Sequence, residues 1–321
     1  MSADTVARGI DKARRGVAPG GRGGGVAAPR RKRGLSTGAI TMLLFAVPSL
    51  VLLLLINLYP LVYAAWQSLR DGVLPAAGEF VGIKNYLDVL ASPEFWSRAR
   101  FTVVFTIVGV FGSWAVGLAF ALMLRTKIPG NTVFKVLLLL PWIVPVVVSA
   151  TAWNFLVATP QSPLPILAES LGLGNVLFLA DPVLAQVTVC VFKVWISFPF
   201  MMMMTSAALA SVDVNVYEAA KMDGAGRVQT FTGVTLPIIA RSTYISWILM
   251  TIFCVNDFPT IFLLTQGGPQ NSTESLVVYA YLRVFQEYAT GPGVAIAFIM
   301  TFVLVVISVI LYRQITKVNV E

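Results

Sequence analysis

Residues 218–237 read EAAKMDGAGRVQTFTGVTLP and separate two long apolar segments in the C-terminal third of the chain. Asn215 is followed three residues later by Glu218, a spacing that is typical of the capping box at the start of a helix. The glycines of DGAG then predict the end of that helix, because glycine tolerates the left-handed backbone conformation that closes a helix. A second short helix is expected to follow and to end before Pro237. The stretch therefore predicts a helix-turn-helix connection between two apolar segments.

The side chains of this connection could serve a partner protein. Small residues allow another backbone to approach closely, and charged residues can pair with a complementary groove. The small ones are Ala219, Ala220 and Ala225, and the charged ones are Glu218, Lys221, Asp223 and Arg227. An ordinary capped loop would show the same amphipathic pattern, so the residues alone favour docking and a plain connection equally.

The composition predicts an all-α integral membrane protein. The chain is 57% hydrophobic and 12% charged, with a mean hydropathy of +0.81, whereas soluble domains carry roughly 25% charged residues. Several runs exceed the approximately 20 apolar residues that a helix needs to cross a bilayer, and the alternating strands of a membrane barrel are absent. About six spans are expected, at residues 39–69, 101–124, 134–158, 183–208, 243–265 and 293–313.

The distribution of charge predicts the orientation. The first 33 residues carry nine basic and two acidic side chains, so the positive-inside rule places the N-terminus in the cytoplasm. Six spans return the C-terminus to the same side. Most of the 23 basic residues, and the 218–237 connection, also fall on the cytoplasmic side of this topology.

Two regions are expected along the chain. Residues 1–35 are rich in Gly, Ala and Arg without periodicity, which predicts a disordered, basic cytoplasmic tail that can touch anionic membrane lipid. Nucleic-acid binding is not expected of this tail, because it lacks aromatic residues and adjoins a membrane. The first apolar segment is too long for a cleaved signal peptide, so it is expected to remain as an anchor. Residues 36–321 form the membrane domain, with the connection at 213–237.

Most enzyme chemistry is excluded by the residues that the sequence lacks. The chain has no histidine, which rules out Ser-His-Asp triads, Cys-His pairs and most zinc sites. Cys190 and Cys254 fall in different spans and are interpreted as small hydrophobic residues. No phosphate-binding GxxxxGK[ST] occurs, and GGPQNST at 267–273 lacks the lysine. We therefore expect no catalytic residue, no metal site and no bound cofactor, and ATP, if used, must bind another polypeptide.

Two opposite charges are expected at similar depth in the membrane. Lys193 lies about 15 Å from the outer end of the fourth span and Asp257 about 12 Å from that of the fifth, at 1.5 Å per residue. A lysine at the centre of a span costs about 2.5 to 3.5 kcal/mol, so it should face a cavity or a counter-charge. The two side chains are expected to pair or to line a translocation path, and a purely structural ion pair is an equal alternative. If they pair, reversing both charges should rescue the reversal of one.

The connection resembles the cytoplasmic EAA loop in the membrane subunits of binding-protein-dependent ABC importers. The residues that match the family pattern are Glu218, Ala219, Ala220, Asp223, Gly224, Ala225, Phe231, Leu236 and Pro237. In that family the loop docks a separate ATPase, so the resemblance implies that these residues form the ATPase-docking site. It also implies a permease in the bacterial plasma membrane that works with a homologous second permease and an extracytoplasmic solute-binding protein. Two copies of the ATPase would carry the ATP and Mg.

Three further stretches resemble the carbohydrate-uptake branch of the family, typified by maltose, trehalose and glycerol-phosphate systems. They are FVGIKNYLDVLASPEFW at 80–96, WISFPF at 195–200 and FLLTQGGPQNSTESL at 262–276. The resemblance implies uptake of a sugar such as trehalose or maltose, with an oligosaccharide or glycerol phosphate as alternatives. Phe101-Thr102 stands where the group often has Asn-Thr, a departure that concerns the substrate and not the class. A secondary transporter is the rival class, although no inverted repeat is visible.

Several polar or aromatic residues in the predicted spans are candidates for the substrate path. Trp153 and Trp195 could stack on a sugar ring, while most polar groups inside membranes join helices to one another. The candidates are Lys193, Trp195, Ser197, Asn256 and Asp257.

Overall fold

The computed structural model describes residues 37–73, 78–125 and 129–317, and the expected tail at 1–35 lies outside them. Apart from an isolated bridge between Arg70 and Phe80, the regular structure of the described chain is helical. In chain order the elements are α1 (Thr37–Ser68), α2 (Lys84–Ala91), α3 (Pro93–Ile107), η2 (Val108–Gly112), α4 (Ser113–Met123), α5 (Asn131–Ile143), α6 (Val146–Val157), α7 (Pro163–Ser170), α8 (Pro182–Ala210), α9 (Val214–Met222), α10 (Arg227–Thr230), η3 (Phe231–Thr235), α11 (Leu236–Val255), α12 (Phe258–Thr265), α13 (Leu276–Phe285) and α14 (Thr290–Lys317). The predicted all-α class is confirmed.

The described residues contain five single helices that are long and apolar enough to cross a membrane. They are Leu44–Ser68, Pro93–Met123, Pro182–Ala210, Arg227–Val255 and Thr290–Arg313. The helices α5 and α6 meet at a sharp bend and form a sixth crossing if they are counted as one span. The prediction of about six spans is therefore confirmed, and the chain is a multi-pass membrane protein.

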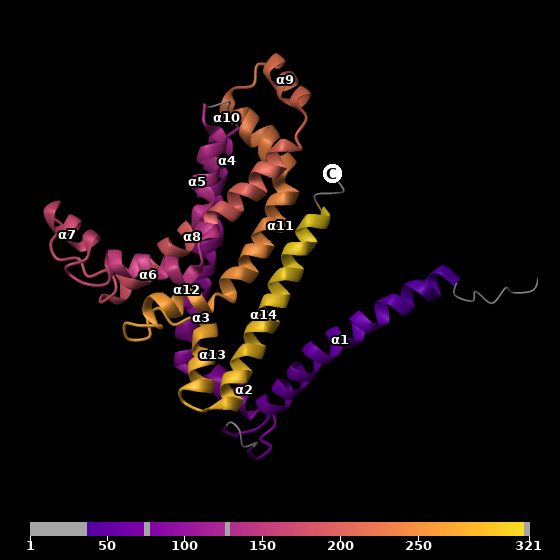
Figure 1. Ribbon diagram of the computed structural model, residues 1–321, viewed down its shortest axis with the longest axis vertical. Coiled ribbons are helices and arrows are strands. Elements are labelled where there is room, and N and C mark those ends of the chain that lie inside the picture. The colour runs from indigo at the N-terminus through magenta and orange to yellow at the C-terminus, as the bar shows by residue number, and fades with distance from the viewer. Residues whose placement is uncertain (1–36, 74–77, 126–128, 318–321) are drawn as a thin grey trace, which may run out of the picture. The chain divides into compact units, whose positions relative to one another are not determined.

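The chain divides into two units, residues 1–56 and residues 57–321. In the second unit, the C-terminal end of α1 is fastened to α2. The side-chain amide of Asn85 donates hydrogen bonds to the carbonyl oxygens of Ser68 and Arg70, both at 2.8 Å. The hydroxyl of Tyr86 donates to the hydroxyl of Ser68 at 2.8 Å. Within this unit, Figure 1 shows α9 and α10 at one end of the helix bundle and α2 and α13 towards the other.

Glycines allow the second span to approach α8 closely. The span consists of α3, the π-helical turn η2 and α4. A Cβ added at Gly112 would lie 2.7 Å from Cγ2 of Val194, and one at Gly117 would lie 2.6 Å from the backbone nitrogen of Met202. Both distances are shorter than real Cβ contacts, so a larger residue would force α8 to shift, at Gly117 against its backbone. Small residues at such contacts are a common means of packing helices in membranes, where no hydrophobic force drives helices together and close van der Waals contact must do so.

The predicted third span at 134–158 is wrong as a single helix. α5 and α6 meet at an angle of 92°. Val144 has extended backbone angles of φ −67° and ψ 133°, and Pro145 follows with φ −53°. Proline disfavours helical geometry in the residue before it, so the helix ends and a new one begins. Hydropathy could not reveal this break, because both halves are apolar.

The predicted fifth span at 243–265 is also wrong in its boundaries. α11 already begins at Leu236 and ends at Val255, and α12 forms a separate short helix. Asp257 caps α12, and Pro259 lies in its first turn, where a missing N–H is tolerated. Asp257 therefore lies at a junction between two helices and not inside a continuous span.

Candidate functional site

The helix that opens the 213–237 connection starts earlier than predicted. α9 is capped by Asp213, whose carboxylate accepts a hydrogen bond from the backbone N–H of Asn215 at 2.9 Å. The predicted cap at Asn215 is wrong, because the charged Asp213 supplies a stronger acceptor at the positive end of the helix. Glu218 is then too far along the helix to complete a capping box, and its side chain is exposed.

Gly224 forms the turn after α9. Its φ is 77°, in the left-handed region. The N–H of Gly224 donates to the carbonyl of Lys221 at 3.1 Å, and the N–H of Ala225 donates to that of Ala220 at 3.0 Å. These two bonds are those of a Schellman motif, which satisfies the last carbonyls of a helix. Gly226 has an ordinary φ of −69° and instead caps the N-terminus of α10. The predicted turn is thus confirmed at the first glycine alone.

The second helix of the connection does not end before Pro237. α10, η3 and α11 run as one helix from Arg227 to Val255. The N–H of Leu236 donates to the carbonyl of Phe231, five residues earlier, which is the bond of a π turn. This wider turn accommodates the proline ring, which would otherwise clash with the preceding turn of an α-helix. The connection is therefore one short helix, a glycine turn and the beginning of the next span.

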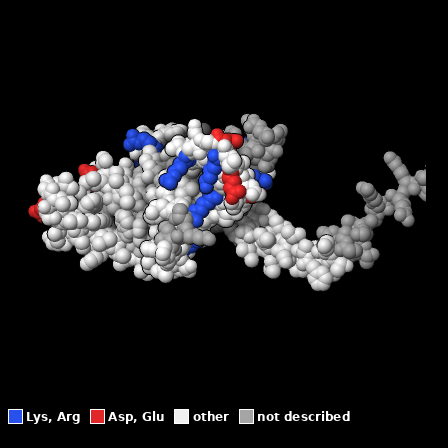
Figure 2. Space-filling model, turned by 90° about the horizontal axis from the view of Figure 1, so that it is seen from above, with Lys and Arg blue, Asp and Glu red and all other residues white. Residues whose placement is uncertain are grey.

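The residues predicted to dock a partner differ in exposure. Those with exposed side chains or backbones are Glu218, Ala219, Asp223, Gly224 and Pro237. Ala220 is buried, whereas Ala225 and Phe231 are partly buried. Phe231 packs on a cluster of apolar residues at the base of α4, α8 and α11. Figure 2 views this end of the molecule and shows basic side chains gathered beside acidic ones. The segment thus presents a charged outer surface on an apolar base.

Lys193 and Asp257 form the ion pair that their predicted depth suggested. Nζ of Lys193 lies 2.6 Å from Oδ2 of Asp257, and the two side chains are 7% and 8% exposed. The second oxygen of Asp257 accepts a hydrogen bond from the backbone N–H of Thr260 at 3.0 Å and so caps α12. One carboxylate therefore holds both the lysine of α8 and the start of α12.

The second span encloses this ion pair. A Cβ added at Gly109 would lie 2.7 Å from Sγ of Cys254 and 3.2 Å from Cγ of Lys193. Nζ of Lys193 lies 6.0 Å from the ring centroid of Phe105, within reach of a cation–π contact. Because neighbouring side chains surround the pair, its geometry favours the structural alternative over a position on an open path.

The other candidates for the substrate path have different surroundings. Trp195 stacks in an aromatic cluster, with its ring centroid 5.7 Å from Trp153 and 6.0 Å from Phe192. Ser197 is 1% exposed. Asn256 is exposed, and its amide donates to the carbonyl of Ile252 at 2.9 Å. The structure thus joins Lys193 to Asp257 and distributes the remaining three residues between a cluster, the interior and the surface.

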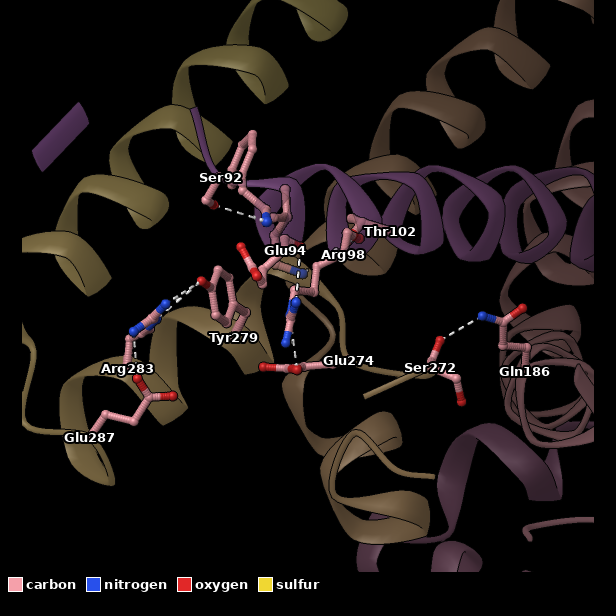
Figure 3. A network of polar contacts seen from close by, with 12 residues as sticks. Ser92, Glu94, Arg98, Thr102, Gln186, Ser272, Glu274, Tyr279, Arg283 and Glu287 are labelled. Carbon is pink, nitrogen blue, oxygen red and sulfur yellow. Dashed lines mark hydrogen bonds and ion pairs between the residues drawn. The ribbon is translucent and has the colours of Figure 1, made fainter. Parts of the chain in front are cut away.

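A polar network around the loop at 266–275 was not anticipated from the sequence (Figure 3). Nε of Arg98, on α3, donates to Oε2 of Glu274 at 3.0 Å, and the side chains are 11% and 3% exposed. The guanidinium carbon of Arg98 lies 4.6 Å from the ring centroid of Tyr279 on α13. The amide of Gln186, on α8, donates to the carbonyl of Ser272 at 2.6 Å. The loop is thereby fastened to α3 and α8, and Arg98 also joins α3 to α13. Arg98 and Glu274 are 176 positions apart, so no local spacing in the sequence could connect them.

Glu274 supports a prediction about stability and pH. Burial raises the pKa of its carboxyl, and the attraction of Arg98 offsets only part of that effect; Arg283 acts in the same direction as Arg98, and Glu287 opposes it. Arg98→Leu should lower the free energy of unfolding by about 2 kcal/mol, because a buried charged acceptor loses its donor. A raised carboxyl pKa means that stability falls as pH rises through the folded pKa. Arg98→Leu removes the attraction that lowers this pKa, so the pKa rises further. The drop in unfolding temperature that the substitution causes should therefore be larger at pH 8 than at pH 5.

Glu274→Gln provides the control for this experiment. Added to Arg98→Leu, it removes the ionisable group, so the difference between the two pH values should disappear. A loss that is equal at both pH values in Arg98→Leu alone would contradict the prediction.

Comparison with known proteins identifies relatives along nearly the whole chain. Residues 20–319 match the family described as binding-protein-dependent transport system inner membrane component. The chain is 34% identical over 276 residues to the trehalose/maltose transport system permease protein MalF of Thermococcus litoralis, which covers 85% of this chain and 92% of the relative. It is 30% identical over 277 residues to the sulfoquinovosyl glycerol transport system permease protein SmoG of Agrobacterium fabrum, covering 85% and 89%.

A solved structure shares the fold. A chain of a bacterial alginate ABC transporter, crystallised in complex with an alginate pentasaccharide-bound periplasmic protein, superposes with a TM-score of 0.75 at 20% identity. The match covers 86% of this chain and 96% of that chain.

Proposed function

Because the chain belongs to the family of binding-protein-dependent transport system inner membrane components, we propose that it is the permease subunit of a sugar importer whose substrate is a disaccharide such as trehalose or maltose. The relatives named for trehalose and maltose and for sulfoquinovosyl glycerol support a carbohydrate or glycoside. Glycerol phosphate or an oligosaccharide is the alternative substrate. The chain itself is not an enzyme in this proposal, and ATP is hydrolysed on a separate subunit.

The exposed surface of α9 carries the proposal for ATPase docking. Glu218 and Asp223 offer carboxylates to basic or backbone partners, while Gly224 sets the direction in which the chain leaves the helix. Phe231 anchors the segment to the apolar base. ATP binding would close a dimer of ATPases, move α9 and open the bundle to the other side, in the manner of alternating access. In this mechanism the permease binds no metal and no nucleotide.

Orientation and partners follow from the same proposal. With α9 in the cytoplasm, an even number of spans places both termini there as well, in agreement with the basic N-terminal residues. The other components would be a homologous second permease, two copies of the ATPase carrying ATP and Mg, and an extracytoplasmic solute-binding protein in a bacterial plasma membrane. The alginate transporter structure, solved with a periplasmic protein, supports the last of these.

Copurification and ATP hydrolysis test the function. The tagged chain, isolated from its native membrane, should bring down an ATPase and a second permease. In vesicles, trehalose or maltose with the solute-binding protein should stimulate ATP hydrolysis, whereas glycerol phosphate should not. Isolation of the chain alone, or sugar uptake driven by an ion gradient without ATP, would instead indicate a secondary transporter.

A further inference from the structure

Few side chains hold α9 against the rest of the protein. Seven of its nine residues are exposed, and the other two are Tyr217 and Ala220. They lie three positions apart and therefore on the same face of the helix. Ala220 has only a methyl group to offer, so Tyr217 is the large side chain by which α9 contacts the bundle.

Tyr217 packs on the base of the bundle. It contacts the apolar cluster that Leu118 and Leu124 of the second span form with residues of α8 and α11. Its hydroxyl oxygen is buried and has no hydrogen-bond partner among the residues that the structure describes. The ring is covered by Arg125, whose guanidinium carbon lies 4.2 Å from the ring centroid. An unpartnered hydroxyl beside a covered ring indicates that the contact depends on the aromatic face and not on the hydroxyl group.

Arg125 lies just beyond the end of the second span, which the chain does not connect directly to α9. The backbone joins α9 directly to α8 on one side and to α10 and α11 on the other. A displacement of α9 can therefore pass to the fourth and fifth spans through the chain itself. It can reach the second span only through side chains. Arg125 lies two residues beyond the end of α4, which packs on α8 so closely that Gly117 admits no Cβ.

We infer that the stack of Arg125 on Tyr217 couples the movement of α9 to the second span, so that both are positioning residues for transport. The inference rests on the proposed docking of an ATPase at α9. Arginine suits this role because its planar guanidinium stacks on an aromatic face while keeping its charge. With the stack in place, the second, fourth and fifth spans would move together. Without it, the second span would follow α9 only indirectly, through the packing of α4 on α8.

The experiment uses the whole complex reconstituted in vesicles, with the solute-binding protein, and measures sugar uptake per ATP hydrolysed. Arg125→Gln and Tyr217→Leu should each lower this ratio about 2- to 5-fold, the range that a cation–π contact of about 0.5 to 1 kcal/mol at an exposed arginine represents. Tyr217→Phe should leave the ratio unchanged, because it keeps the ring and removes an unpartnered hydroxyl. Arg125→Lys should fall between, since lysine keeps the charge but not the planar stack.

A matched control and a double variant complete the test. Lys135→Gln removes an exposed positive charge near the start of α5 and should not change the ratio. The double variant Arg125→Gln/Tyr217→Leu should be no worse than the more impaired single variant, because both break one contact. Losses that multiply in the double variant, a ratio equal to wild type in both single variants, or loss of the ATPase on copurification would each overturn the inference. A wild-type complex without an ATPase would instead contradict the proposed function.

Discussion

Gly224→Val is expected to abolish sugar uptake driven by ATP while leaving insertion into the membrane intact. Gly224 closes α9 at φ 77°, and the space around it is open, with no atom within 4 Å of an added Cβ. The obstacle is therefore conformational: a left-handed residue with a side chain costs about 1 to 2 kcal/mol, and a β-branched one is a clear outlier. The chain can avoid this cost by unwinding the end of α9, which displaces the charged surface from Glu218 to Asp223.

Two other variants separate conformation from side-chain size. Gly233→Ala adds a methyl group in η3, where φ is not positive and nothing lies within 4 Å, so uptake should stay near wild type. Gly224→Asn should be intermediate, because asparagine tolerates the left-handed region better than valine does. The amount of protein in the membrane should be equal for all three. Normal uptake by the valine variant would count against docking at this turn.

Lys193→Met is expected to cause the other large loss, in this case of the folded protein. It leaves the carboxylate of Asp257 buried without its counter-charge, a change that typically costs about 3 to 5 kcal/mol. Both side chains are at most 8% exposed, so solvent cannot replace the lost partner. The yield of monodisperse protein in detergent and its unfolding temperature measure the effect. A Met variant as stable as wild type would show that the pair contributes little.

The hydrogen bond by which Asp257 caps α12 limits how much stability a double variant with exchanged charges can recover. Exchanging the two charges restores an ion pair, but a lysine at position 257 cannot accept the N–H of Thr260. The exchange should therefore recover only part of the stability. Lys193→Met with Asp257→Asn should recover more, since asparagine keeps an acceptor for the cap. Glu287→Gln is the matched control: its pair with Arg283 is 49% exposed at the glutamate, and its loss should cost no more than about 0.5 kcal/mol.

The number and approximate positions of the spans could be predicted because long apolar segments have few alternatives in a membrane protein. The turn at Gly224 could be predicted because glycine favours the conformation that the turn requires. The pairing of Lys193 with Asp257 could be predicted from their similar depth in the membrane, because each charge would cost free energy there if it were unpaired. The first two predictions rest on local properties of the sequence, and the third on the positions of two charges within different spans.

The errors occurred where two local signals competed or where contacts join distant residues. Asp213 and Asn215 are both good caps, and only the backbone shows that the aspartate is used. A proline inside a helix usually ends it, but at Pro237 the π turn just before the proline removes the clash of its ring with the preceding turn. The contacts of Arg98 with Glu274 and of Arg125 with Tyr217 bring together positions far apart in the sequence. No periodicity within one segment could reveal them.

The π turns also affect how homologous sequences should be compared. A turn with i to i+5 bonding holds about one residue more than an α-helical turn, so side chains beyond it are rotated by about 100° relative to an uninterrupted helix. A helical wheel drawn straight through η2 would therefore assign Gly117 to the wrong side of the second span. A relative that lacks one residue at η2 in an alignment would therefore have a straight α-helix at this point, without the π turn.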